Sequence, residues 1–194
     1  MEISEEVKGV LLLAARSAID SLFEESHPLF IDFNCYPILL EKNIGAFVTL
    51  TENEELRGCI GYIDSGDQTL IDTVCNAAKH AAVNDPRFNP LTQEELQNIN
   101  IEISLLSPFT TLNEYEDIQL GIHGLLLTEG NKKGLLLPQV AVENKFTLPQ
   151  FLTAICQKTG VSSNLWKNKK LDLKVFTAVV FSELGKRKRT HESV

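Results

Sequence analysis

The chain has 194 residues, of which 43% are hydrophobic and 23% are charged, and its formal net charge is −8. This length and composition are typical of a globular protein with one sizeable core, or of two small lobes that share one. The acidic balance excludes a chain whose overall charge attracts nucleic acid.

The first expected element is an amphipathic helix over residues 4–26. Ser4 is a good N-cap residue, and Glu5 and Glu6 suit the positive end of a helix. Charged residues recur along this stretch, which excludes a membrane span of about 20 mostly apolar residues. The acidic start is also opposite to the positive start of a secretory signal, so we expect a cytoplasmic protein.

The next elements are a hairpin and two helices. Two β-rich runs, 45–50 and 55–63, are separated by four polar residues and predict the hairpin. Residues 68–84 return to a helical apolar pattern, which is ended by two prolines within 85–90. Residues 92–95 begin with Thr and end with Glu, a capping box that predicts a short helix.

The second half of the chain is again a mixture of strands and a helix. Residues 99–106 alternate between apolar and polar side chains, as in a half-buried strand. We expect a second hairpin over 118–128 and 135–138, a helix over 147–159 and a last strand over 171–181. Antiparallel hairpins mixed with helices predict an α+β fold, with a mixed sheet packed against helices, rather than a doubly wound parallel sheet.

The sequence LRGCIG at residues 56–61 is unusual for a strand, because it contains an arginine, a cysteine and two glycines. Its leucine and isoleucine are expected to face the core, which puts Arg57 and Cys59 together on the opposite face. A cation beside a cysteine favours the thiolate. Gly58 and Gly61 have no side chains, so a ligand or another backbone can come close.

Two interpretations of Cys59 remain open. It is either a small buried residue, as free cysteines usually are, or a nucleophile with a lowered pKa. The other cysteines, Cys35, Cys75 and Cys156, form no CxxC pair, so we expect reduced thiols. The four histidines form no H-x3-H or HExxH pattern, and we expect no metal site.

Residues 85–88, Asp-Pro-Arg-Phe, have the chemistry of a turn, because Pro86 fixes the backbone. In one interpretation the motif is a rigid corner, in which Asp85 and Arg87 pair with each other or cap neighbouring backbone groups. In the other interpretation, Arg87 points into a cleft and binds a carboxylate or a phosphate.

His123 lies between two glycines in an apolar run that predicts a strand. Catalysis, metal binding and a hydrogen bond to the backbone are all open to such a histidine. Gln139 follows the apolar run 134–138 and either lines a pocket or supports the architecture. No GxSxG, Walker or GxGxxG motif is present.

The basic run KRKR at residues 186–189 is the densest cluster of positive charge in the chain. It follows the last expected strand and precedes polar residues. We therefore expect residues 185–194 to form a disordered, solvated tail rather than a nucleic-acid patch.

Five motifs in a fixed order give the chain a family resemblance. They are LRGCIG (56–61), DPRFNPL (85–91), GIHGLLL (121–127), GLLLPQVA (134–141) and FLTAICQKTG (151–160), the last followed by Trp166. Together they resemble the AMMECR-type domain, whose prokaryotic members are called protein A of the AmmeMemoRadiSam system. The residues that match are Arg57, Gly58, Cys59, Gly61, Asp85, Arg87, Phe88, His123, Gly124 and Pro138.

The resemblance implies a single AMMECR-type domain over residues 1–184, built as two unequal lobes in one compact unit. It also implies a genomic context with a Memo-like protein, itself similar to metal-dependent dioxygenases, and a radical S-adenosylmethionine protein. It supplies no reaction, no cofactor and no oligomeric state. The chain departs from the family pattern at residues 62–67, where YIDSGD replaces a more usual stretch that contains proline.

Three functions are compatible with these observations. The first is an accessory or binding protein that acts with Memo-like and radical S-adenosylmethionine partners in a modification pathway. The second is an enzyme acting on a small anionic substrate, with Cys59 as nucleophile or redox centre and His123 as base. In that hypothesis Arg57 lowers the pKa of the thiol and Arg87 holds the substrate. The third is nucleic-acid binding through the tail, which the net charge of −8 disfavours. The remaining candidate binding residues are Gly58, Gly61, Asp85 and Gln139.

Overall fold

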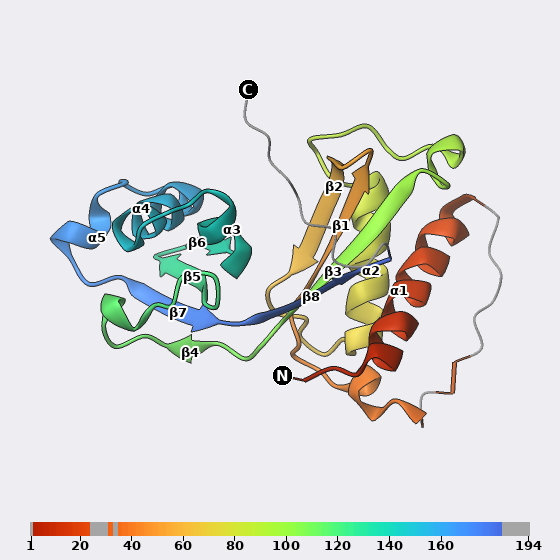
Figure 1. Ribbon diagram of the computed structural model, residues 1–194, viewed down its shortest axis with the longest axis horizontal. Coiled ribbons are helices and arrows are strands. Elements are labelled where there is room, and N and C mark those ends of the chain that lie inside the picture. Colours follow the sequence, from red (N-terminus) through yellow and green to blue (C-terminus); the bar gives the residue numbers. More distant parts are fainter. Residues whose placement is uncertain (1, 24–30, 33–34, 184–194) are drawn as a thin grey trace. The chain divides into compact units, whose positions relative to one another are not determined.

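The computed structural model describes residues 2–23, 31–32 and 35–183. The chain forms two compact units, of which unit 1 is Met1–Leu105 with Val179–Val194 and unit 2 is Leu106–Ala178 (Figure 1). Unit 1 is therefore built from both ends of the chain, and unit 2 is one continuous segment. Each unit has its own cluster of buried hydrophobic side chains.

Unit 1 begins with helix α1, Glu5–Asp20, which starts where the sequence predicts. The Ser4 hydroxyl accepts a hydrogen bond from the Val7 N–H, and two glutamates lie in the first turn, at the positive end of the helix. A short 3-10 helix, Ser21–Phe23, follows. The expected end of the helix at residues 26–28 lies outside the described residues.

The sheet of unit 1 has four strands in the order β2-β1-β3-β8. Strand β1 pairs antiparallel with both β2 and β3, which confirms the first predicted hairpin. The connecting turn is Asn53-Glu54, at φ values of 50° and 70°, so it is shorter than the four polar residues suggest. The bounds are β1 (Ala46–Glu52), β2 (Glu55–Tyr62), β3 (Ile99–Leu106) and β8 (Ala178–Ser182).

Helix α2, Leu70–Val83, contacts α1, β1 and β2 and is capped by Thr69. Figure 1 shows α1 and α2 beside each other. Two 3-10 helices, η3 (Pro37–Leu40) and η4 (Gln93–Glu95), complete the unit, and η4 has the capping box that the sequence predicts. The core includes Leu11, Ala15, Ile19, Leu39, Val48, Leu50, Leu70, Val74, Ala78, Ile101 and Ile103.

Unit 2 contains a second sheet of four strands, in the order β4-β7-β5-β6. The strands are β4 (Thr110–Thr111), β5 (Gly124–Glu129), β6 (Lys132–Leu136) and β7 (Asp172–Phe176). The helices are η5 (Tyr115–Asp117), α3 (Pro138–Glu143), α4 (Leu148–Thr159) and α5 (Leu165–Asn168). Helix α4 packs on β5 and β6 and buries the face that its periodicity predicts: Phe151, Leu152, Ile155 and Cys156.

Three strand predictions are wrong in their extent, and one of them is 135–138, which is observed as β6 over Lys132–Leu136 because Pro138 begins α3. The expected strand over 171–181 is two strands, β7 and β8, which separate at Thr177 and belong to different sheets. The expected strand over 118–128 begins only at Gly124. Gly121 has a φ of 82°, a left-handed conformation that a regular strand does not contain. The His123 N–H donates to the Gln119 carbonyl at 2.8 Å, so these residues form a turn before β5.

The α+β class with antiparallel pairing is confirmed. That the two units act as one domain over residues 1–184 stays a prediction, and the tail over 185–194 lies outside the described residues. Among the described residues, no helix combines the length and apolar character needed to cross a membrane.

Candidate functional site

Strand β2 lies at the edge of the unit 1 sheet and is irregular at Arg57. Its pairing with β1 skips this residue, because Gly58 and Leu56 face consecutive residues of β1. Arg57 is therefore the extra residue of a β-bulge, and the alternation of faces that the sequence predicts is broken there. The prediction that Leu56 faces the core is wrong, since this side chain is 43% exposed.

Gly58 is the point at which helix α2 approaches β2. A Cβ at Gly58 would lie 2.2 Å from the backbone oxygen of Ala81, so a side chain would force the helix to move. At Gly61, the ring of Phe47 fills the space that a side chain would need. Of the two predicted uses of these glycines, the close approach of another backbone is the one that Gly58 shows.

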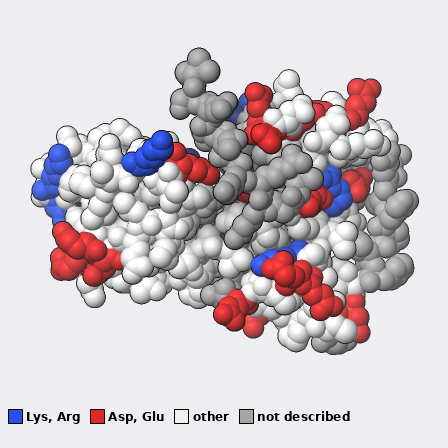
Figure 2. Space-filling model, viewed as in Figure 1, with Lys and Arg blue, Asp and Glu red and all other residues white. Residues whose placement is uncertain are grey.

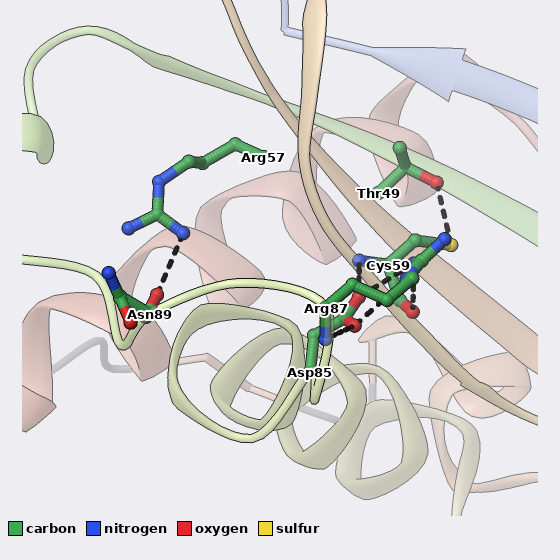
Figure 3. A network of polar contacts seen from close by, with 6 residues as sticks. All are labelled: Thr49, Arg57, Cys59, Asp85, Arg87 and Asn89. Carbon is green, nitrogen blue, oxygen red and sulfur yellow. Dashed lines mark hydrogen bonds and ion pairs between the residues drawn. The ribbon is translucent and has the colours of Figure 1, made fainter.

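Arg57 fastens β2 to the segment that follows α2. Its Nε and Nη2 donate to the two Glu95 carboxylate oxygens at 2.7 and 3.1 Å. Its Nη1 and Nη2 also donate to the carbonyls of Asn89 and Pro90, at 3.0 and 3.4 Å. Figure 3 shows the guanidinium directed toward Asn89 and away from the contacts around Cys59. The cation that was expected to favour the Cys59 thiolate is thus engaged elsewhere.

Asp85 is the centre of a second set of contacts, at Cys59. Its side chain is 1% exposed. Its carboxylate accepts hydrogen bonds from the backbone N–H groups of Cys59 and Arg87, at 2.8 and 3.1 Å. Nε and Nη2 of Arg87 also donate to it, at 2.9 and 2.7 Å. The carboxylate takes the place that a neighbouring strand would have at this edge, so the Cys59 N–H is paired.

Arg87 is fixed in position and remains accessible. Its side chain is 54% exposed, and its Nη2 also donates to the Cys59 carbonyl at 3.4 Å. The guanidinium carbon lies 5.4 Å from the centre of the Phe88 ring. Within the described residues its Nη1 makes no hydrogen bond. An exposed guanidinium that is oriented by a buried carboxylate is a preorganised donor for an anion.

The Cys59 thiol is half-buried and lies beside Thr49 of β1 (Figure 3). The two residues are cross-strand partners, and the Thr49 hydroxyl donates to Sγ at 3.3 Å. The Cys59 N–H and carbonyl point away from β1, toward Asp85 and Arg87 at the free edge of β2. Cys59 and Thr49 therefore form the closer, non-hydrogen-bonded type of strand pair. The arginine joined to Cys59 is therefore Arg87 rather than Arg57.

Both carboxylates are held in the ionised form. Pairing with Arg87 is the main cause that keeps the pKa of Asp85 well below its usual range, against the opposite effect of burial. The hydrogen bonds from Arg57 likewise lower the pKa of Glu95 from 4.5 to about 2. The two ion pairs are consequently complete at neutral pH.

The remaining candidates, His123 and Gln139, belong to unit 2 and are described by themselves. Nδ1 of His123 accepts the Gln119 N–H at 3.2 Å, which leaves Nε2 for other contacts. The histidine lies in the turn before β5, so its predicted place within a strand is wrong. Gln139 is half-buried in the first turn of α3. That they act with Cys59 or Arg87 stays a prediction.

The contacts described above join the first two motifs of the resemblance, LRGCIG and DPRFNPL. A family model described as AMMECR1 matches residues 12–181. The chain belongs to the AMMECR1 family. The predicted family membership is therefore confirmed over most of the chain.

Relatives of this AMMECR1 chain match it over most of their length. A protein of Pyrobaculum arsenaticum is 36% identical over 182 residues, which cover 89% of this chain and 84% of the relative. A protein of Methanothermobacter thermautotrophicus is 35% identical over 189 residues, or 94% of this chain and 97% of the relative. A crystal structure of a Pyrococcus horikoshii protein is 33% identical, has a TM-score of 0.85 and covers 97% of this chain and 99% of its own. These similarities show the family and its fold.

Sequence reasoning missed two residues of this AMMECR1 site. The sequence predicts Glu95 only as part of a capping box, and its bond to Arg57, 38 residues away, has no local signal. Thr49 had no usable signal either, because counting outward from the hairpin turn places it opposite Gly58, and only the bulge at Arg57 shifts it opposite Cys59. The site thus combines a thiol, a hydroxyl donor and an exposed guanidinium. No group of three or more His, Cys, Asp or Glu residues in the described part of the chain is placed to hold a metal ion.

Proposed function

We propose that this AMMECR1-family protein is an accessory binding component that acts with a Memo-like protein and a radical S-adenosylmethionine protein in a modification pathway. The choice of partners is supported by the family resemblance. The observation that supports a binding role is the state of Arg87, which buried Asp85 orients and which is 54% exposed. Arginine is enriched among the residues that dominate the energy of protein interfaces.

The bound group in this proposal is an anion, a carboxylate or a phosphate, that accepts a hydrogen bond from Arg87. Asp85 already restricts the guanidinium, so little side-chain freedom is lost when the anion binds. The ring of Phe88 shields one side of the same cation. The first motif then has a supporting role, because Arg57 bonds Asn89 and Pro90 of the second motif and Gly58 lets α2, which precedes that motif, lie against β2.

The test is co-purification of the full chain with Memo-like and radical S-adenosylmethionine proteins from the same genome. Arg87→Ala is compared with Lys42→Ala, a matched control whose side chain is 53% exposed and only loosely paired with Asp67, at 3.8 Å. We expect Arg87→Ala to weaken the association about tenfold or more, as loss of a central arginine does, and Lys42→Ala to leave it unchanged. No association at any concentration, or equal effects of both variants, would contradict the proposal.

A second candidate is an enzyme in which the Cys59 thiol acts on a small anionic substrate. The observation that favours it is the hydrogen bond from Thr49 to Sγ at 3.3 Å, together with the bond between Arg87 and the Cys59 carbonyl. In this hypothesis Arg87 holds the substrate, and His123 remains the candidate base. The role of Arg57 in lowering the pKa of the thiol stays a prediction, because all three of its side-chain nitrogens are bonded to Glu95 and two backbone carbonyls.

Iodoacetamide labelling against pH separates this candidate from the first. Cys35 is exposed, so Cys35→Ser is the background, and peptide mapping identifies the labelled residue. An enzyme requires Cys59 to label faster than a free thiol at neutral pH, and Arg87→Ala to slow the labelling. If Cys59 reacts no faster than a free thiol, the enzyme hypothesis fails and the binding role remains.

A further inference from the structure

Unit 2 has a surface groove that neither of these functions uses. Its volume is about 320 Å³, and it lies between residues 113–115 and residues 166–170. The first of these segments leads into η5, and the second runs from α5 toward β7. The volume is at the low end of the range for sites that hold small ligands, roughly 300–1,000 Å³.

Two aromatic rings in the groove are fixed at their polar ends. Tyr115 and Trp166 meet edge to face, with 6.4 Å between ring centres and 80° between ring planes. The Tyr115 hydroxyl accepts the Leu171 N–H at 2.9 Å, and the Trp166 indole N–H donates to the Thr153 hydroxyl at 3.1 Å. Both rings are half-buried, so they give the groove a preformed apolar surface.

The rim of the groove is positively charged. Lys169 forms an ion pair with Glu129 at 2.7 Å. The ammonium group of Lys167 lies 5.3 Å from the centre of the Trp166 ring, and Lys170 makes a long ion pair of 3.8 Å with Glu114. The last pair is largely exposed and contributes little, so both of these lysines can turn to an incoming anion. Figure 2 shows basic side chains at the place where Figure 1 labels α5, with a patch of acidic side chains beside them.

The charge of unit 2 as a whole has the same sign as this rim. Residues 106–178 contain eight lysines and six acidic residues, although the complete chain has a net charge of −8. An anion is therefore not repelled from this unit as it is from the rest of the chain.

We propose that this groove binds a nucleoside phosphate. The planar base lies against Tyr115 and Trp166, and the phosphate is held by Lys167 and Lys170. Lysine binds phosphate as a point charge and suits a flexible rim. The amides of Asn113 and Asn168, also in the lining, supply both donors and acceptors for the edge of a base. An acidic peptide would use the lysines and leave the paired rings and the amides without a role.

The experiment uses the fluorescence of Trp166, which is the only tryptophan in the chain and so reports this groove alone. The full-length protein is titrated with adenosine monophosphate, adenosine, inorganic phosphate and a short oligoadenylate, with calorimetry as a second measurement. We expect adenosine monophosphate to change the fluorescence and to bind more tightly than adenosine or phosphate. Tighter binding of the oligoadenylate would identify single-stranded RNA as the source of the nucleotide, and equal binding a free nucleotide.

Three variants decide whether the binding is at the groove. Loss of both lysines, in Lys167→Ala with Lys170→Ala, is expected to weaken binding of adenosine monophosphate about tenfold. Glu114→Gln removes a negative charge from the lining, so it is expected to strengthen binding severalfold. Lys174→Ala removes an exposed lysine of β7 that does not line the groove, and it is expected to leave binding unchanged.

Several results would overturn the proposal. The first is the absence of both a fluorescence change and calorimetric heat at millimolar nucleotide. The second is equal affinity for inorganic phosphate and adenosine monophosphate, which would remove the rings from the site. The third is an equal effect of Lys174→Ala and the double variant, which would show that only general charge matters. All the substituted side chains are exposed, so the variants are expected to fold, and circular dichroism checks this.

Discussion

Two arginine–carboxylate pairs bind strand β2, one at the bulge and one at Cys59. The arginine is the more buried member of the first pair, and the carboxylate is the more buried member of the second. In the first pair, Arg57 is 15% exposed and also bonds two backbone carbonyls. In the second pair the carboxylate is buried, and Asp85 also accepts two backbone N–H groups. Its arginine faces solvent.

This reversal separates structure from function in two ion pairs that consist of the same kinds of group, a guanidinium and a carboxylate. The buried member of each pair makes two backbone hydrogen bonds, and its partner makes one: Glu95 accepts the Thr92 N–H and Arg87 donates to the Cys59 carbonyl. Both carboxylate oxygens of Glu95 are bonded to Arg57 and the cap of η4, whereas Nη1 of the exposed Arg87 side chain makes no hydrogen bond within the described residues. An ion pair with one accessible member can therefore hold the fold and still offer a binding group.

The largest expected effect is on the buried carboxylate. Asp85→Ala leaves the Cys59 N–H without its acceptor and removes the anchor of Arg87, so it should lower the free energy of unfolding by about 3 kcal/mol. Arg87→Ala keeps both backbone hydrogen bonds of Asp85 but leaves its buried carboxylate without a counter-ion, so a smaller loss of about 2 kcal/mol is expected. Urea denaturation of both variants measures the difference. Equal losses would show that the exposed arginine contributes as much to stability as the buried carboxylate.

The second effect concerns the buried arginine. Arg57→Ala removes the contacts to Glu95, Asn89 and Pro90 together, and should lower the free energy of unfolding by about 2 kcal/mol. Glu95→Gln keeps a side chain that can still accept from Arg57, so about 1 kcal/mol is expected. Denaturation curves of the two variants test this order, and a larger loss for Glu95→Gln would reverse it.

The third effect is on pH dependence. The pKa of Glu95 is lowered from 4.5 in its ordinary state to about 2 in the folded protein. The unfolded chain binds more protons than the folded protein in this range. The contribution of Glu95 to the free energy of unfolding is therefore fully present above about pH 4.5 and is lost as the pH falls toward 2. The share of Glu95 should be about 1 kcal/mol, and Glu95→Gln should flatten the curve by that amount. Unfolding measured across the acid range, with an unchanged slope in the variant, would contradict this.

The smallest effect is at the sulfur. Thr49→Val keeps the shape of the side chain and removes the hydrogen bond to Cys59, so a loss of about 0.5 kcal/mol is expected. Its effect on iodoacetamide labelling is the sharper measurement. If labelling of Cys59 is the same in Thr49→Val and wild type, the hydroxyl does not influence the thiol and the pair serves only the sheet.

Much of the fold could be predicted because its signals are local. The cap at Ser4 and the apolar stripe of α4 are confirmed, and so is the strand β3, although its alternation of buried and half-buried residues ends at Ile103. The strand over 171–181 could not be divided correctly, because both halves contribute buried residues and the break at Thr177 leaves no mark in the periodicity. Where an apolar run changes sheets is decided by the partners it meets.

The candidate site could be predicted in its members but not in their pairing. Cys59, Asp85 and Arg87 were expected to matter, and the structure brings these three together. The sequence placed Arg57 beside the thiol, since regular alternation allows no other arrangement. One extra residue at the bulge removed that arrangement.

The family, the fold class and most of the helices and strands follow from the order of the residues, because motifs and periodicities are properties of neighbouring residues. Which arginine lies at Cys59, and which carboxylate binds Arg57, depends on how distant segments fold together. Folding also brings Tyr115 and Trp166 together in one groove, although they are far apart in the chain. Contacts of this kind depend on how distant segments pack, and no local pattern encodes them.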